Sequence, residues 1–254
     1  MTDDAYVREI EDHRAALRAG LRAPSSTLAA IARHELPVGQ RVRVGPGGDI
    51  PLDGVTRSIA VVAHANGFTV DGEETQPGQI DLGRYRLRLS HQNHPAVVIL
   101  DAESPHLADD VQLRWWPVDP RLRLRSRLEP DGSRTAIGST ASADRAAERA
   151  GWLPVTIDGV PVRLLALRLL EPGFAPDHLD VYFRDSTTGR GSYEVGRYVG
   201  VERDGDEAVV DFNRAYNPAC ALSPYYNCPI PPRENHLTVP IRAGEMTPAS
   251  IHRP

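Results

Sequence analysis

Short runs of strand-forming residues, separated by turn residues, recur along the chain from about Gln40. The turns come at intervals of roughly ten residues, which is the spacing typical of a β-sandwich or barrel. The clearest run is RLRLRSRLEP at 121–130, where leucines alternate with arginines. Such alternation points one set of side chains into a core and the other into solvent. The pattern therefore predicts a mainly β protein of antiparallel strands.

The individual runs predict the positions of the strands. VTIDGVPV is expected to be a hairpin, because its Asp158-Gly159 pair suits a type I′ turn. The small and polar stretch 139–151 is expected to be a loop or a single helical turn. The range 68–74 is expected to be extended chain that carries an Asp71-Gly72 turn. We expect single strands at 41–44, 58–64, 84–89, 96–100, 121–130, 163–171, 178–185, 207–213 and 236–245.

The N-terminal residues are expected to form a helix, because Val7, Ile10, Leu17 and Leu21 recur at helical spacing and would share one buried face. Asp3 or Asp4 can cap it, and Gly20 and Pro24 can end it. A short second helix is expected after Ser25 or Ser26. We interpret the two helices as a brace packed over a sheet rather than as an oligomer contact. The predicted domains are helices over 1–36, a β-sandwich over 37–115 and a C-terminal β domain over 116–254.

Charge and composition exclude several classes of function. The net charge of −5 favours no nucleic-acid partner, because phosphate binding needs a concentrated positive surface. No stretch approaches the ~20 apolar residues of a membrane helix, and Met1 is followed by acidic residues rather than by a signal peptide, so we predict a cytoplasmic protein without membrane contact. All 29 basic residues are arginines, which excludes a Schiff-base lysine and a phosphate-loop lysine.

The segment 211–236 is the least ordinary part of the sequence. It holds both cysteines, five prolines, four asparagines and three tyrosines. Proline fixes φ and removes a backbone donor, so the segment is expected to be a long connection held in one shape. Such a connection suits the wall of a binding site or a plug in the open end of a barrel.

The cysteines in this segment, Cys220 and Cys228, allow three interpretations. They can be buried thiols, a disulfide, or metal ligands together with His236. A structural zinc ion usually takes four ligands, and a cytosol keeps most thiols reduced. We therefore favour buried thiols, then a disulfide, and we predict no metal and no cofactor.

Two long motifs in the C-terminal half resemble a known family. YFRDSTTGRGSYEVGRYVGV and VVDFNRAYNPACALSPYYNCPIPPRENHLTVPIRAGE are similar to the signature of domain-of-unknown-function family 1684, a bacterial and archaeal family. WWPVDPRLRLRSRLEP, at 115–130, also resembles that family. The resemblance brings no activity with it. It singles out Arg184, Asp185, Tyr193, Gly196, Arg197, Asp211, Asn213, Tyr216, Asn217, Pro218, Cys220, Cys228, Glu234 and Asn235.

The N-terminal half resembles another module. VGPGGDIPLDG and FTVDGEE are similar to parts of a forkhead-associated (FHA) β-sandwich, which reads phosphothreonine. The Ser-x-x-His element of that module is missing, so the resemblance implies an FHA-like fold, and phosphopeptide binding does not follow from it.

Charged and amide residues dominate the family signature, which favours a polar site there. Arg184 and Arg197 are expected to hold an anionic group, and Asn213 and Asn217 to orient it. The predicted acid–base residues are Asp211 and Glu234. The other predicted ligand-binding residues are Asp185, Tyr193, Tyr216, Cys220, Cys228 and Asn235.

Two functions remain open from the sequence. The first is a binding protein or enzyme for a small anionic molecule. The second is a protein-interaction module in which the polar residues form a purely structural network. The identity of the ligand and the oligomeric state remain open.

Overall fold

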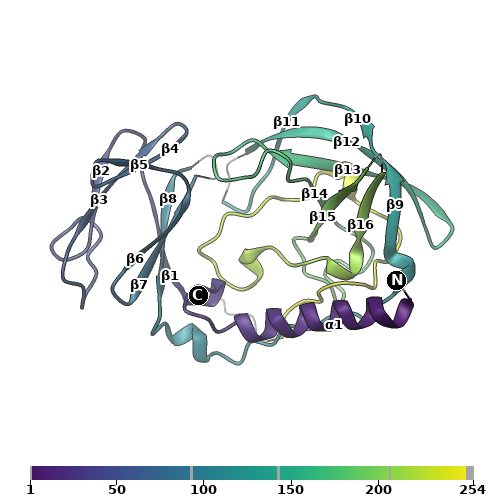
Figure 1. Cartoon of the computed structure of the whole chain (residues 1–254), viewed down its shortest axis with the longest axis horizontal. Helices are drawn as coiled ribbons and strands as arrows, with labels where there is room; N and C mark the ends of the chain where they lie inside the picture. The colour runs from purple at the N-terminus through teal and green to yellow at the C-terminus, as the bar shows by residue number, and fades with distance from the viewer. Residues whose placement is uncertain (1, 92–93, 142–143, 206, 250–254) are drawn as a thin grey trace. The chain divides into compact units, whose positions relative to one another are not determined.

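The computed structural model describes residues 2–91, 94–141, 144–205 and 207–249 (Figure 1). The described chain is mainly β, with one α-helix at the N-terminus and several antiparallel sheets, as the alternating runs predict. It forms two compact units. One comprises Gly20–Asp109 with Glu171–Phe174, and we call it the sandwich unit. The other comprises the segments up to Ala19, Asp110–Leu170 and from Ala175 on, and we call it the barrel unit.

The sandwich unit consists of two four-stranded antiparallel sheets of described residues. One hydrophobic cluster takes side chains from both sheets, including Val44, Phe68, Leu87 and Ile99. In hydrogen-bonded order, the first sheet contains β1 (Ala30–Glu35), β8 (Ala96–Asp101), β7 (Tyr85–Ser90) and β6 (Gly78–Leu82). The second contains β2 (Arg41–Val44), β3 (Ile59–His64), β4 (Gly67–Val70) and β5 (Glu73–Thr75).

The barrel unit contains an eight-stranded sheet that is nearly closed. The Ser126 hydroxyl of β9 donates to the Pro154 carbonyl of β12 across the remaining opening, at 2.7 Å. The strand order is β10 (Glu129–Pro130), β12 (Arg145–Ile157), β13 (Val160–Leu169), β14 (Asp180–Phe183), β15 (Arg197–Asp204), β16 (Glu207–Asp211) and β9 (Arg123–Arg127), and β11 (Arg134–Ile137) also pairs with β12.

Both faces of the barrel sheet are buried at its centre. Val181 and Phe183 of β14 lie in one hydrophobic cluster, whereas Tyr182, between them in sequence, lies in another. Alternate side chains of a strand point to opposite faces, so β14 separates the two clusters. This explains why all four of its residues are buried.

The helix α1 (Asp3–Gly20) begins and ends where the sequence predicts. Its buried residues are Tyr6, Ile10 and Arg14, which recur every four residues and therefore share one face. Leu17, expected on the buried face, is 36% exposed. None of the described helices is both long enough and apolar enough to cross a membrane.

The second predicted helix is confirmed only in part, because it begins after Ser26 as predicted but ends at Ala29. The structure has a single 3₁₀ turn, η1 (Thr27–Ala29), followed directly by β1. Residues 32–35 pair with 96–99 of β8 in an antiparallel ladder. A partner strand far along the sequence therefore decided the local structure, and helical propensity over so few residues is too weak to resist it.

Two further predictions are corrected. Residues 145–151, expected in a loop or helical turn, begin the long strand β12, because β13 offers a partner over most of its length; residues 142–143 of that stretch lie outside the described residues. Residues 236–245 do not form the expected closing strand. Among the described residues they make only single bridges, from His236 to Arg184 and from Glu245 to Trp115.

The segment 211–236 runs through short 3₁₀ turns, as its prolines predict. The turns are η4 (Phe212–Arg214), η5 (Ala219–Ala221) and η6 (Arg233–Asn235); two others, η2 (Pro105–Ala108) and η3 (Pro120–Leu122), precede β9. The residues that follow η6 enter the barrel core, where Leu237, Val239, Ile241 and Ala243 are buried. The irregular C-terminal segment 237–243 thus fills part of the barrel interior (Figure 1).

Candidate functional site

The predicted site residues do not converge on one opening, and most of them fall into four sets of contacts. The first set joins Arg197 to Asp185. The guanidinium donates to an Asp185 carboxylate oxygen at 2.8 Å, and both side chains are almost completely buried, at 1% and 0% exposed. The remaining oxygen of Asp185 accepts from the backbone and hydroxyl of Thr187 at 2.7 and 2.6 Å.

The other donors of Arg197 are bound by the C-terminal segment. They reach the carbonyl oxygens of Ile241 at 2.7 Å, Ala243 at 2.5 Å and Glu245 at 3.0 Å. Burial lowers the pKa of Arg197, and the charge of Asp185 opposes this. If residues 236–245 formed a strand, these carbonyls would bond to a neighbouring strand. In the structure they bond to the Arg197 guanidinium instead.

Asn235 forms the second set, together with two barrel strands. Its side-chain amide accepts from the backbone of Leu165 and donates to the carbonyls of Leu165 and Tyr182, at 2.8–2.9 Å. β13 and β14 pair at Leu167 and Asp180, and in the same antiparallel register Leu165 and Tyr182 would lie opposite each other two residues further along. The amide bridges the two strands where their direct pairing stops.

Arg184 and Glu234 flank Asn235 but have different partners. The Arg184 Nε donates to the Val195 carbonyl at 2.9 Å. Glu234 accepts from Arg149 at 2.6 Å, and this bond lowers the pKa of the Glu234 carboxyl. Glu234 is therefore held ionised, a state that can accept but not donate a proton.

Asp211, the other predicted acid–base residue, forms the third set. Both of its carboxylate oxygens accept from the Tyr6 hydroxyl of α1, at 2.7 and 2.8 Å. Asn213 donates to the Asp211 carboxylate from its backbone and from its side chain, at 3.1 and 3.2 Å. The side-chain amide of Asn213 also accepts from the Asp119 backbone N–H and donates to the Asp119 carbonyl, both at 2.8 Å. Burial and the Asp211 carboxylate raise the pKa of Tyr6, so the hydroxyl remains a donor. These bonds attach the helix to the end of β16.

The fourth set surrounds the two cysteines and Glu245. Cys220 and Cys228 are free thiols, and the Tyr193 hydroxyl donates to the Cys220 carbonyl at 3.3 Å. Asn217 donates from its backbone to Glu245 and from its side chain to the Met246 carbonyl, both at 2.8 Å. Burial raises the pKa of Glu245 to about 7. In the part of the chain that the structure describes, no group of three potential metal ligands occurs.

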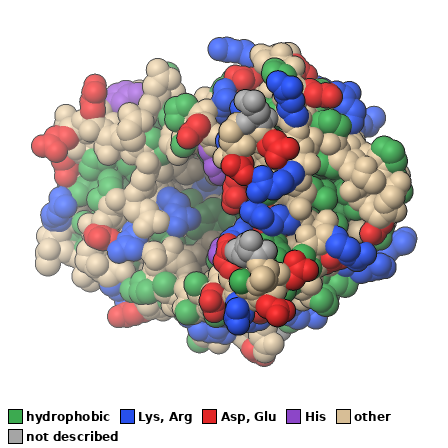
Figure 2. All heavy atoms as spheres, turned by 45° about the vertical axis from the view of Figure 1, so that its right-hand side comes forward, with side chains coloured by type: hydrophobic (Ala, Val, Ile, Leu, Met, Phe, Trp, Pro, Cys, Tyr) green, Lys and Arg blue, Asp and Glu red, His purple; other side chains and the backbone are tan. Residues whose placement is uncertain are grey.

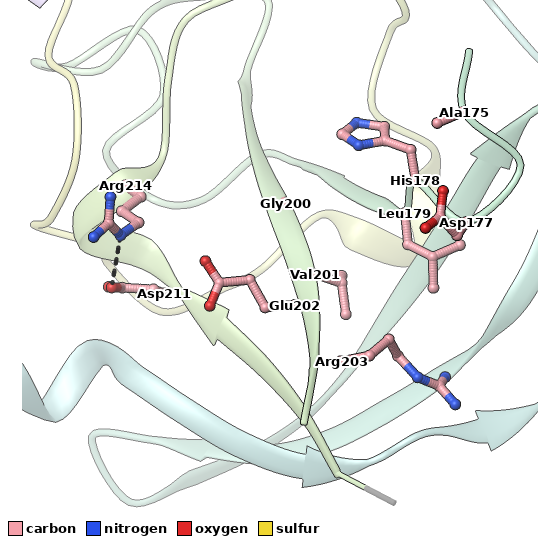
Figure 3. A pocket seen from close by; sticks show the side chains of 10 residues that line it. All are labelled: Ala175, Asp177, His178, Leu179, Gly200, Val201, Glu202, Arg203, Asp211 and Arg214. Carbon is pink, nitrogen blue, oxygen red and sulfur yellow. Dashed lines mark ion pairs between the residues drawn. The ribbon is translucent and has the colours of Figure 1, made fainter. Parts of the chain in front are cut away.

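A cleft of about 400 Å³ lies elsewhere in the barrel unit (Figure 3). Of the predicted site residues, only Asp211 lines it, at one edge beside its ion pair with Arg214 at 3.5 Å. Strand β15 crosses the cleft, and Arg203 projects from it on the opposite side from the Asp211–Arg214 pair. The lining residues are Ala175, Asp177, His178, Leu179, Gly200, Val201, Glu202, Arg203, Asp211 and Arg214.

His178 is the lining residue that sequence reasoning missed. Its Nε2 lies 2.9 Å from a carboxylate oxygen of Asp180, which is buried, whereas the imidazole is half exposed. The hydroxyls of Tyr182 and Tyr216 also donate to Asp180, at 3.2 and 3.4 Å. Burial raises the pKa of Asp180, and the nearby His178 opposes that rise. His178 and Asp180 are two residues apart at the start of the predicted strand 178–185, a spacing that places both side chains on one face of a strand. This spacing was the signal in the sequence that could have identified the pair.

Together these contacts define a mainly β protein in which a nearly closed barrel is held together by buried polar side chains. The chain belongs to the family described as "Protein of unknown function (DUF1684)", which matches residues 111–246 and so confirms the predicted resemblance. The matched range contains every predicted site residue.

A solved structure is also similar to this chain. It is the solution structure of the uncharacterized protein from gene locus rrnAC0354 of Haloarcula marismortui, with 34% sequence identity and a TM-score of 0.46. The match covers 56% of this chain and 80% of that protein. No curated protein matches the chain.

Proposed function

We propose that the protein binds a small anionic molecule in the cleft between His178 and Asp211, either as a binding protein or as an enzyme. The observation that carries the proposal is the cleft itself, whose volume of about 400 Å³ lies in the range of ligand sites. Arg203 is exposed there and makes no ion pair with another described residue. Its guanidinium can therefore hold a carboxylate or phosphate.

The pair of His178 and Asp180 supports acid–base chemistry in the same cleft. A buried carboxylate that binds one nitrogen of an exposed imidazole fixes the orientation and tautomer of the ring. Histidine is the side chain that most often transfers protons in enzymes. We therefore propose His178 as the acid–base residue, since Asp211 and Glu234 are engaged by Tyr6 and Arg149.

The test is a thermal-shift screen of the full chain against a panel of phosphate and carboxylate metabolites. For any compound that raises the Tm, Arg203→Ala should weaken binding roughly tenfold to a hundredfold, because a hydrogen bond to a charged group contributes about 1.5–3 kcal/mol. Asp177→Asn removes a negative charge from the cleft lining and should not weaken binding.

Arg127→Ala is the matched control, because Arg127 is an exposed arginine of the same unit outside the cleft. If no compound raises the Tm, or if Arg203→Ala binds as tightly as the unchanged protein, the proposal is wrong.

The second candidate function is a protein-interaction module. It is favoured by the buried contacts of Arg197, Asp185 and Asn235, which use the polar residues of the signature within the fold. A fully satisfied buried network can serve to fix one structure. This candidate would be preferred if the metabolite panel gave no shift and the chain formed a stoichiometric complex with another protein.

A further inference from the structure

The two cysteines of the chain contact each other although seven residues separate them in the sequence. The backbone N–H of Cys220 donates to the Cys228 sulfur at 3.4 Å, and both residues are free thiols. Cys228 is only 5% exposed, whereas Cys220 is partly open to solvent. One thiol of the pair can therefore meet a dissolved reagent while the other lies behind it.

Neighbouring segments hold each cysteine in place. The backbone of Cys228 exchanges two hydrogen bonds with Thr140, one from its N–H to the threonine hydroxyl at 2.9 Å and one from the Thr140 N–H to its carbonyl at 3.0 Å. Cys220 lies in η5 and its carbonyl accepts from Tyr193. The contact between the two cysteines is therefore fixed by hydrogen bonds of the fold.

The surroundings also make the two thiols chemically different. A hydrogen bond from the Cys228 thiol lowers the pKa of Cys220, and the Tyr193 side chain acts in the same direction. The same bond, together with burial, raises the pKa of Cys228. A thiolate is the reactive form of cysteine, so Cys220 suits the role of the attacking thiol and Cys228 that of the resolving thiol.

We propose that Cys220 and Cys228 form a redox-active dithiol site that reacts with hydroperoxides and closes to a reversible disulfide. The Cys220 thiolate attacks an oxygen of the hydroperoxide, the O–O bond breaks, and the departing oxygen takes up a proton and leaves as an alcohol or as water. Cys220 is then a sulfenic acid. The Cys228 sulfur attacks the Cys220 sulfur, and hydroxide leaves with the Cys228 proton as water. The two thiols lose two electrons in total, and the hydroperoxide gains them.

The test uses the reduced full chain, treated in steps with hydrogen peroxide and, separately, with tert-butyl hydroperoxide. Free thiols are counted after denaturation, the intact mass is recorded, and the cross-linked peptide is mapped. We expect both thiols to disappear together, the mass to fall by two hydrogen atoms, and an intramolecular Cys220–Cys228 bond to appear. Dithiothreitol should restore both thiols.

Two variants test the separate roles of the thiols. Cys228→Ser should stop at a sulfenic acid on Cys220, which dimedone traps. Cys220→Ser should leave Cys228 as a persistent thiol under the conditions that oxidise the unchanged protein, because Cys228 is only 5% exposed and a buried thiol is shielded from the reagent.

Peptide mapping of the oxidised, unchanged protein tests the proposal even if a variant fails to fold. Thiols that persist, a Cys220 that proceeds to sulfinic or sulfonic acid in place of the disulfide, or bonds formed only between molecules would each overturn the proposal.

Discussion

Arg197 acts, at the scale of a single residue, as a cross-link for the backbone. One guanidinium binds the Asp185 carboxylate and three carbonyls of the C-terminal segment, all within 3.0 Å. Those carbonyls lie in the barrel core without a strand partner, and a buried carbonyl without a hydrogen bond is costly. The charged side chain therefore allows the barrel core to contain irregular backbone.

Removal of this cross-link should destabilise the protein strongly. Arg197→Ala leaves the Asp185 charge buried without its partner, so the free energy of unfolding should fall by about 3–5 kcal/mol. Urea unfolding of the variant measures the loss. Arg127→Ala, in which the arginine is exposed, should change stability by less than about 0.5 kcal/mol. A variant at Arg197 as stable as that control would instead favour a ligand-binding role for this residue.

Glu245 should make stability depend on pH. Its pKa is about 7 in the folded chain against 4.5 as the ordinary value, and burial is the first cause. Between these values the folded state holds a proton that the unfolded state has lost. The contribution of Glu245 to stability is therefore greatest below about pH 4.5 and falls by about 3 kcal/mol as the pH rises to about 7.

The measurement is urea unfolding at several pH values on the unchanged protein and on Glu245→Gln. The glutamine keeps an oxygen that can accept from Asn217 but does not titrate. The variant should gain stability relative to the unchanged protein as the pH rises through this window. Two parallel pH profiles would show that burial does not perturb Glu245.

Gly196, at the scale of an element, allows β15 to begin where it does. Its φ is +121°, in the region that side-chain-bearing residues rarely adopt. A Cβ at this position would lie 2.6 Å from a Pro231 ring carbon and 2.7 Å from the Phe183 carbonyl. The strand start is therefore packed directly against both β14 and the Pro-rich segment.

Gly196→Ala should lower the free energy of unfolding by about 2 kcal/mol or more, because strained φ and overpacking each contribute about 1–3 kcal/mol. Gly200→Ala is a close control, since Gly200 lies within β15, which Gly196 directly precedes, and a Cβ at Gly200 meets nothing within 4 Å. Chemical denaturation of both variants gives the comparison. Equal effects of the two substitutions would mean that the close approach at Gly196 is not what constrains the strand.

The whole molecule contains two compact units, each with a hydrophobic core of its own. Phe68 lies in the core of the sandwich unit and Phe183 in that of the barrel unit, both 1% exposed. Arginines and carboxylates intermingle over the face of the molecule shown in Figure 2. Since each unit buries its own apolar surface, each can unfold as a cooperative block.

Calorimetry on the full chain should therefore resolve two transitions. Phe68→Ala and Phe183→Ala should each destabilise one unit by about 3–5 kcal/mol, and each should lower one transition while the other remains. A single transition that both substitutions shift equally would mean that the units unfold together.

The sequence alone determined the features that depend on neighbouring residues. The alternation of Leu with Arg at 121–130 predicted a strand, although the structure divides this range into a 3₁₀ turn, β9 and β10. The Asp158-Gly159 pair predicted the hairpin turn, in which both residues have a positive φ, of 48° and 80°. The helix ended at Gly20, and the prolines excluded regular structure from 211–236, for the same kind of local reason. The family signature also identified Asp185 and Arg197 as special residues.

Tertiary structure decided the features that depend on distant partners. Residues 145–151 became a strand because β13 lay beside them, and 236–245 did not because Arg197 bound its carbonyls. The burial of Arg197 and the exposure of His178 were likewise set by packing. Local patterns specify what a segment can form, whereas burial and hydrogen-bond partners depend on which segments meet, and that is settled only when the chain packs.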